Sequence, residues 1–156
     1  MTIQGIKPST KDVDFIVPVE SEYVSLLRTL VKLGYRKTTG SGWSRQDGFL
    51  FDLFEGNRVY ITELLESPLE EGNNVPIMDL KKIYVGALND YDLVTTKLFR
   101  ASSVDMEDCL ALLRFRGKAF DLRKLKERYR ETARYDVNPD RMLQNLESFL
   151  QRVETD

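Results

Sequence analysis

The sequence predicts an α+β fold, with a small sheet and one helix in its first half and helices through its second half. The prediction rests on a change of period near residue 88. Before it, short apolar stretches separated by glycine and proline turns are typical of strands. After it, apolar residues recur about every three and a half positions, as on one face of a helix. We expect residues 1–88 to form an α/β core and residues 89–156 a helical part that packs on it in a single compact unit.

The first strand is predicted at residues 12–17, where the odd-numbered residues are all apolar and Pro18 helps to end the strand. A helix is predicted from residue 20 to about residue 33, and Gly34 lies just beyond its end. The apolar stripe of this helix consists of Tyr23, Leu27, Leu30 and Val31.

Two turns divide the segment after this helix. Gly40-Ser41-Gly42 lies between two predicted strands, and Asp47-Gly48 precedes a third. Residues 49–54 (FLFDLF) are predicted to form that third, mostly buried strand. Residues 66–76 contain two prolines, a glycine and two asparagines, so we expect a loop there. Residues 83–87 are predicted to form one more strand.

Four helices are predicted after residue 88, each with a recognisable start. Asn89 is a plausible cap for the first, and Ser102 or Ser103 for the second. Asp121 caps the third, and Asn138-Pro139 starts the fourth with a cap followed by proline at the first helical position. Their apolar faces include Val94 and Leu98, Met106 and Cys109, Leu125 and Tyr129, and Leu146 and Phe149.

The composition excludes several classes of active site. The chain has no histidine and one cysteine, so it cannot form a Ser-His-Asp or Cys-His site or a histidine-ligated zinc site. Any bound metal must be held by oxygen ligands, which favours magnesium or manganese. A lone cysteine fits a reducing compartment, and no apolar run reaches the roughly 20 residues that cross a bilayer, so we expect a cytoplasmic protein. The net charge of -2 argues against a general affinity for nucleic acid or membranes.

Two aspartates on the first predicted strand share one face of the sheet. Asp12 and Asp14 are two residues apart, so their side chains point the same way. Two carboxylates this close repel each other unless a cation lies between them, and Mg²⁺ prefers such oxygen ligands. Asp52 interrupts the apolar strand at 49–54, where a charge is costly unless it lies at an open end or meets a cation. Three carboxylates on neighbouring strands could hold two metal ions roughly 4 Å apart, the arrangement that assists phosphoryl transfer.

The Asp-x-Asp pair has a simpler explanation when it is taken alone, because such a pair at the start of a strand is usually a solvated strand end. The position of Asp52, after the order strand, helix, hairpin and strand, is what favours the metal site.

Four segments of the chain together resemble the nucleotidyltransferase superfamily. They are most similar to its small prokaryotic branch, which includes minimal nucleotidyltransferases and the nucleotidyltransferase-like toxins of abortive-infection systems. Residues 5–14 (GIKPSTKDVD) resemble the end of the family's first motif, and residues 47–54 (DGFLFDLF) resemble the strand with its third aspartate. Residues 89–93 (NDYDL) with residues 97–101 (KLFRA) resemble the family's later lysine motif. Residues 105–108 (DMED) resemble the acidic motif that follows it.

This likeness extends over roughly residues 5–115. It implies a nucleotidyltransferase-like fold, a small mixed sheet flanked by helices with a helical C-terminal part. It also implies that Asp12, Asp14 and Asp52 are catalytic and bind Mg²⁺. The reaction implied is transfer of a nucleotidyl group from a nucleoside triphosphate to an acceptor hydroxyl.

The resemblance assigns the nucleotide to Thr10, Lys97 and Asp108. Lys97 would be catalytic and meet the triphosphate, and Asp105 or Asp108 would orient Lys97 or the substrate. Simpler explanations exist for these three residues. A lysine at this position can lie along the edge of the core with its head in water, and acidic residues near a helix start are favourable in any case.

The chain departs from the family's pattern at its first residues. The family has a Gly-Gly or Gly-Ser turn roughly ten residues before the paired aspartates, and its backbone amides hold the triphosphate. Met1-Thr2-Ile3-Gln4 contains no such turn. Either the start has been assigned too late or the phosphate cradle has been lost.

Residues 114–134 are rich in base and could contact RNA phosphates, although most basic helices are solvated faces. The other partners we expect are a nucleoside triphosphate and a cognate antitoxin or a second copy of the chain.

Two hypotheses follow for the function. The first is a magnesium-dependent nucleotidyltransferase acting on an RNA or protein hydroxyl, as a toxin–antitoxin component. The second is a catalytically degenerate nucleotidyltransferase fold that binds nucleotide, RNA or protein.

Overall fold

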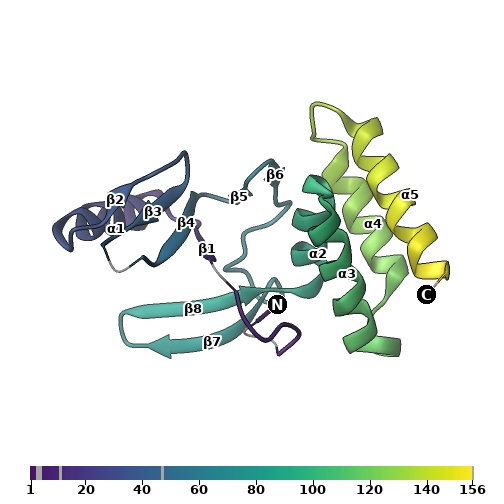
Figure 1. Cartoon of the computed structure of the whole chain (residues 1–156), viewed down its shortest axis with the longest axis horizontal. Helices are drawn as coiled ribbons and strands as arrows, with labels where there is room; N and C mark the ends of the chain where they lie inside the picture. The colour runs from purple at the N-terminus through teal and green to yellow at the C-terminus, as the bar shows by residue number, and fades with distance from the viewer. Residues whose placement is uncertain (3–4, 11, 47, 156) are drawn as a thin grey trace.

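The computed structural model describes residues 1–2, 5–10, 12–46 and 48–155, and the side chain of Asp12 lies outside what it describes. Figure 1 shows the sheet and its helix at one side, a group of helices at the other, and a short segment of strand between them. A second, longer β-hairpin extends below the sheet in this view.

A four-stranded sheet and one helix form the first part. The strands are β1 (Asp12–Val17), β2 (Arg36–Lys37), β3 (Gly42–Ser44) and β4 (Leu50–Glu55), in the order β1-β4-β3-β2. β1 and β4 are parallel and the other neighbouring pairs are antiparallel, so the sheet is mixed, as predicted. Parallel neighbours need a long crossover, and α1 (Glu20–Lys32) with the β2–β3 hairpin provides it.

The sheet has one apolar face, which packs on α1. Phe51 and Leu53 are buried there with Leu30 and Trp43. Since side chains alternate along a strand, Asp52 lies on the opposite face of β4. The fold therefore separates the acidic side chains from the apolar face of the sheet that packs on α1.

The apolar stripe of α1 differs from the prediction at one position. Leu30 is buried, whereas Val31 is 62% exposed, so its predicted place on the buried stripe was wrong. Successive helical residues are turned by about 100°, and the face that packs on the sheet is the one through Leu30. Tyr23, Leu26 and Leu27 complete it.

A short hairpin links the sheet to the helical part and was not predicted. It consists of β5 (Arg58–Val59) and β6 (Thr62–Glu63). Val59 and Thr62 are buried, and β6 packs against the first helix of the C-terminal part. The turn at residues 60–61 is consequently held between the two parts of the molecule.

The longer hairpin is formed by β7 (Asn74–Leu80) and β8 (Ile83–Leu88). β8 matches the strand predicted at 83–87, but the loop predicted at 66–76 ends too late, because its last residues already belong to β7. Pro76 is tolerated there because the pairing is irregular between Pro76 and Met78, where a missing N–H costs little.

The second part consists of helices, in agreement with the prediction. They are α2 (Asp90–Arg100), α3 (Ser103–Arg116), the 3₁₀ turn η1 (Gly117–Ala119), α4 (Leu122–Ala133) and α5 (Pro139–Thr155). None of the described helices is both long and apolar enough to cross a membrane.

The predicted caps are confirmed. Asn89 accepts a hydrogen bond from the backbone of α2, Ser102 rather than Ser103 caps α3, and Asp121 caps α4. The helices share one apolar core, in which the rings of Phe99 and Tyr129 meet edge to face at 5.0 Å. The sheet and the helices thus have separate cores, and the polar residues discussed below lie where the two parts meet.

Candidate active site

Asp14 and Asp52 lie next to each other on the parallel strands β1 and β4. They are direct partners in the register, and this places both side chains on the face that does not pack on α1. The Tyr60 hydroxyl lies 2.9 Å from Oδ1 of Asp14 and 3.3 Å from Oδ2 of Asp52. The Ser41 hydroxyl donates to Oδ1 of Asp52 at 2.6 Å. The backbone of Asp12 continues the same register, but its side chain is outside the described residues.

The turn before β3 is built to bring Ser41 to Asp52. Gly42 is buried, its N–H donates to Oγ1 of Thr39 at 3.2 Å, and its partner in the register of β4 is Asp52. A Cβ at position 42 would collide with Oγ1 of Thr39. A larger residue at position 42 would therefore displace the Thr39 side chain that closes the turn beside Ser41.

The backbone of Tyr60 and two contacts to its ring hold this residue in place. It has a positive φ of 54°, a strained conformation for a residue with a side chain. The Phe54 ring lies 4.6 Å away, and the Arg100 guanidinium lies 4.5 Å from the ring centre. Burial, together with the charges of Asp14 and Asp52, raises the pKa of Tyr60. Its hydroxyl is therefore a protonated donor at neutral pH.

The second half of the site is formed by the tight connection between α2 and α3. Ala101 ends α2 in the left-handed conformation with a φ of 52°, and the next residue is already the cap of α3. The end of α2 therefore faces the first turns of α3. Lys97 and Arg100 are three residues apart on α2, and Asp105 and Asp108 are three apart on α3, so each pair shares one helical face.

These four side chains form a ladder of ion pairs. Nζ of Lys97 is 2.8 Å from Oδ2 of Asp108 and 3.5 Å from Oδ1 of Asp105. Arg100 contacts both oxygens of Asp105, at 2.6 Å and 3.2 Å. Lys7, from the segment before β1, reaches the other oxygen of Asp108 at 2.5 Å. The ladder therefore gathers three cationic side chains, those of Lys7, Lys97 and Arg100, and Arg100 connects it to Tyr60.

The two carboxylates of the ladder are ionised despite their burial. Burial raises the pKa of Asp105, but hydrogen bonds from Arg100 and Ser102 outweigh it and hold that pKa below its usual range. Burial likewise opposes ionisation of Asp108, and the hydrogen bonds from Lys7 and Lys97 again leave its pKa lowered.

The structure brings together most of the residues that the sequence singled out. Asp14 and Asp52 form one group, and Lys97, Asp105 and Asp108 form a second. Lys97 does not extend into water, because its head lies between two carboxylates. Thr10 is exposed and lies just before β1.

Sequence reasoning missed Ser41, Tyr60, Arg100 and Lys7. Arg100 had a detectable signal, since it follows Lys97 by three residues on a predicted helix. Tyr60 had none, because its partner Asp14 is 46 residues away and no periodic pattern surrounds it.

The basic segment at 114–134 is divided between structural and exposed residues. Arg116 pairs with Asp90 at 2.6 Å, and Arg128 contacts both oxygens of Asp92, at 2.6 Å and 2.9 Å. These two arginines tie helices together. The exposed basic residues are Arg114, Lys118, Arg123, Lys124, Arg130 and Arg134.

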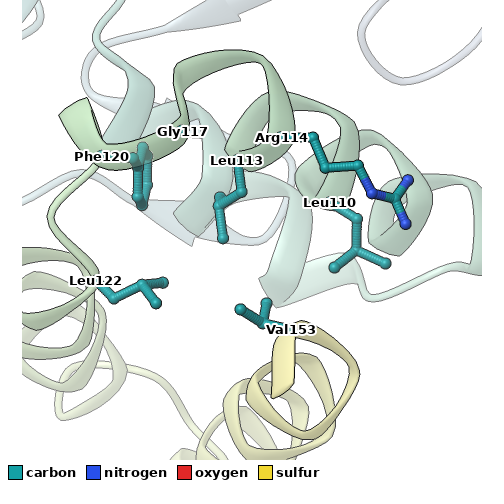
Figure 2. Close-up of a pocket in the computed structure, with 7 residues that line it drawn as sticks. All are labelled: Leu110, Leu113, Arg114, Gly117, Phe120, Leu122 and Val153. Atoms are coloured by element: carbon teal, nitrogen blue, oxygen red, sulfur yellow. The ribbon is translucent and has the colours of Figure 1, made fainter. Parts of the chain in front are cut away.

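An apolar pocket lies away from the carboxylates of Asp14 and Asp52. It has a volume of about 420 Å³ and lies among the ends of α3 and α5 and the start of α4. Figure 2 shows Leu113, Phe120, Leu122 and Val153 around it, with Arg114 at its edge. Its lining is apolar and contains no acidic residue, so it lacks the groups that phosphoryl transfer needs.

Comparison with protein families matches residues 2–155 to the family described as "Nucleotidyltransferase of unknown function" (DUF6036). The chain belongs to this nucleotidyltransferase family. The match covers both the sheet with its paired aspartates and the helices that carry Lys97 and Asp108. No curated protein matched the chain.

The donor atoms at this nucleotidyltransferase site suit a hard cation. Asp14 and Asp52 offer carboxylate oxygens from neighbouring strands, and no histidine exists in the chain to favour zinc. Within the described part of the chain, no group of three or more acidic or cysteine side chains is arranged so that it could hold a metal ion. The two described carboxylates of the sheet, those of Asp14 and Asp52, are the groups on this face that could hold such a cation.

Proposed function

We propose that the chain is a magnesium-dependent nucleotidyltransferase that transfers a nucleotidyl group from a nucleoside triphosphate to a hydroxyl of RNA or protein. One observation carries the proposal: Asp14 and Asp52 are register partners on one face of the parallel pair β1–β4 in a chain of this family. Two adjacent carboxylates on a face without apolar cover are expensive for the fold to keep and useful for binding a cation.

Asp14 and Asp52, with Asp12, are the residues that would hold Mg²⁺. The ion supplies charge neutralisation at the phosphate oxygens and at the leaving pyrophosphate. Lys97 would meet the negative charge of the triphosphate. The carboxylate of Asp108 already holds the Lys97 ammonium in position. The lysine side chain would therefore lose little conformational freedom when the substrate binds.

Two cations that the sequence did not reveal support the same end of the substrate. Arg100 lies over the Tyr60 ring, between the carboxylates of the sheet and those of α3. Lys7 shares Asp108 with Lys97. With Asp105 and Asp108 as their counterions, the three cations leave the ladder with one positive charge in excess, which favours a triphosphate.

Thermal unfolding with nucleotide and Mg²⁺ tests the proposal. We expect a nucleoside triphosphate to raise the Tm only when Mg²⁺ is present, and we expect the effect to disappear in Asp14→Asn and in Asp52→Asn. Asp79→Asn is the matched control, because Asp79 is an exposed aspartate on β7. Equal stabilisation of all four proteins would refute the proposal.

A second candidate is a binding module without catalysis. It is favoured by the fact that the polar groups already satisfy one another: Tyr60 lies against both carboxylates of the sheet, and the cations of α2 are paired with those of α3. The two candidates are distinguished by labelled nucleoside triphosphates. Transfer of label to RNA or protein that requires Asp14 supports the enzyme, and nucleotide binding without any transfer supports the module.

The acceptor is proposed to be RNA or a protein hydroxyl, and a toxin–antitoxin role is part of the same proposal. The exposed basic residues Arg130, on α4, and Arg134, just after its end, offer contacts to RNA phosphates. Charge reversal at these two positions should reduce RNA binding and its dependence on salt. RNA binding that is unchanged by the reversal would direct attention to a protein acceptor.

A further inference from the structure

We propose that the hydroxyl of Tyr60 is itself a nucleotidyl acceptor, so that the chain modifies its own tyrosine. The inference rests on the proposed function, because it uses the same carboxylates and the same nucleoside triphosphate. It goes beyond that function by naming an acceptor residue within the chain.

The position of the Tyr60 hydroxyl is that of an acceptor. An acceptor hydroxyl must lie close to the groups that position the reacting phosphate, because reaction needs the two reacting atoms about 3–3.5 Å apart. The Tyr60 oxygen is 2.9 Å from Oδ1 of Asp14 and 3.3 Å from Oδ2 of Asp52. Ser41 also contacts a carboxylate, but it contacts Asp52 alone. Tyr60 thus lies between the two carboxylates, whereas Ser41 supports one of them from the β3 side.

The surroundings keep Tyr60 in this position. The residues on either side of it belong to β5 and to the turn before β6, where Val59 and Thr62 are buried. Its strained φ of 54° persists because the hairpin is anchored at both ends. Residues in sparsely populated backbone conformations cluster at functional sites, and here the strain directs a phenol toward two carboxylates.

The substrate has access to the hydroxyl. Asp14 is exposed and Tyr60 is only partly buried, so an α-phosphate can approach from solvent. The Arg100 guanidinium, 4.5 Å from the Tyr60 ring centre, is placed to balance the negative charge of the incoming phosphate and of the product.

The step is a simple substitution at phosphorus. The Tyr60 oxygen forms a bond to the α-phosphorus, and the bond from that phosphorus to the bridging oxygen of pyrophosphate breaks. The phenolic proton passes to solvent water, and pyrophosphate leaves with the electron pair. The product is a tyrosyl phosphodiester, and no oxidant or reductant is needed. The modified oxygen has no hydrogen left to donate, so the adduct can no longer hold the two carboxylates together.

Mass spectrometry of the full chain tests the inference. The protein is incubated with Mg²⁺ and each of the four ribonucleoside triphosphates, and the intact mass and the peptide that contains Tyr60 are measured. We expect one nucleotidyl adduct on Tyr60 and at least a tenfold loss of adduct in Tyr60→Phe. Tyr135→Phe is the control, because Tyr135 is 75% exposed and would be modified first by any non-specific reaction. An adduct on Ser41 or Tyr135 in place of Tyr60 would overturn the inference.

A binding measurement separates this inference from the proposed function. The Tm of the wild-type chain with Mg²⁺ and an α,β-methylene nucleoside triphosphate, which cannot react, should rise. If wild type binds this analogue but shows no adduct on Tyr60, the inference fails and the proposed function stands. If wild type binds neither the analogue nor the natural triphosphates in the presence of Mg²⁺, both fail together.

Discussion

The helical part and the sheet part of the molecule differ in how they use their side chains. The helices bury a continuous core that includes three aromatic residues, Phe99, Tyr129 and Phe149. The sheet buries a small cluster on one face and leaves the other face to Asp14 and Asp52. Lys97 and Arg100 are thus on the well-packed part, and Asp14 and Asp52 are on the lightly packed part. This division predicts that stability depends mainly on the helices and that metal binding depends on the sheet.

The largest effect on stability is expected from the core of the helices. Phe149 is fully buried, and Phe149→Ala should lower the free energy of unfolding by about 4 kcal/mol through lost burial and a residual cavity. The equivalent change in the sheet, Phe51→Ala, should cost about 2–3 kcal/mol, because its small cluster can collapse around the gap. Urea unfolding of both variants measures the difference. A greater loss in Phe51→Ala would contradict the comparison.

The next largest effect is expected at an ion pair that ties two helices together. Arg128 on α4 binds the buried carboxylate of Asp92 on α2 and also reaches Glu66 at 3.4 Å. Arg128→Ala should cost about 3 kcal/mol, because the Asp92 carboxylate would remain buried without its cation. Arg130→Ala is the control on the same helix, and since Arg130 is exposed its loss should change stability by less than about 0.5 kcal/mol. Similar costs for the two arginines would show that the ion pair contributes little.

A smaller, pH-dependent effect is expected at Asp108. Its pKa in the folded protein is lowered, with burial opposed and outweighed by the hydrogen bonds from Lys7 and Lys97. A carboxylate with a lowered folded pKa contributes stability above its unfolded pKa of about 4, and this contribution is lost as the pH falls through the folded value. Asp108→Asn should therefore be less stable than wild type by about 2 kcal/mol at pH 7.

The difference between wild type and Asp108→Asn should shrink as the pH is lowered below about 4. Denaturant unfolding between pH 7 and pH 2.5 measures it. A difference that is independent of pH would mean that the Asp108 carboxylate is not stabilised by its ion pairs.

The smallest effect on stability, with a measurable effect on substrate binding, is expected at Lys7. Lys7 is partly exposed and shares Asp108 with Lys97, so Lys7→Met should change the free energy of unfolding by less than about 1 kcal/mol. The same change should weaken binding of a magnesium nucleotide about tenfold, because one cation of the ladder is lost. Calorimetric titration checks this. Unchanged affinity would limit the triphosphate end of the site to Lys97 and Arg100.

The sequence predicted the elements whose signals are local. The caps at Asn89, Ser102 and Asp121 were predictable because each depends on a side chain bonding to the backbone two or three residues later. Strand β7 was missed because most of its residues are exposed, so no alternation of apolar and polar residues marks it. Its pairing with β8 depends on partners up to 14 residues apart, such as Asn74 and Leu88, which a local pattern does not reveal.

The candidate site was predictable only in part, because a local sequence pattern does not reveal contacts between residues far apart in the chain. Asp14 and Asp52 stood out because a charge in an apolar strand is costly wherever the strand lies. Tyr60 did not stand out, because its role comes from a hairpin that places it against both carboxylates. The neighbours of a side chain across the fold, unlike those along the chain, are set by the packing of the two parts.

Binding of Mn²⁺, followed by electron paramagnetic resonance, tests the central claim that Asp14 and Asp52 hold one cation together. We expect the wild-type chain to bind Mn²⁺, and Asp14→Asn and Asp52→Asn each to weaken binding at least tenfold. The double variant should be little weaker than either single variant, because one ligand alone no longer forms the site. Asp79→Asn should bind as wild type does. Wild-type affinity in both Asp14→Asn and Asp52→Asn would contradict the claim.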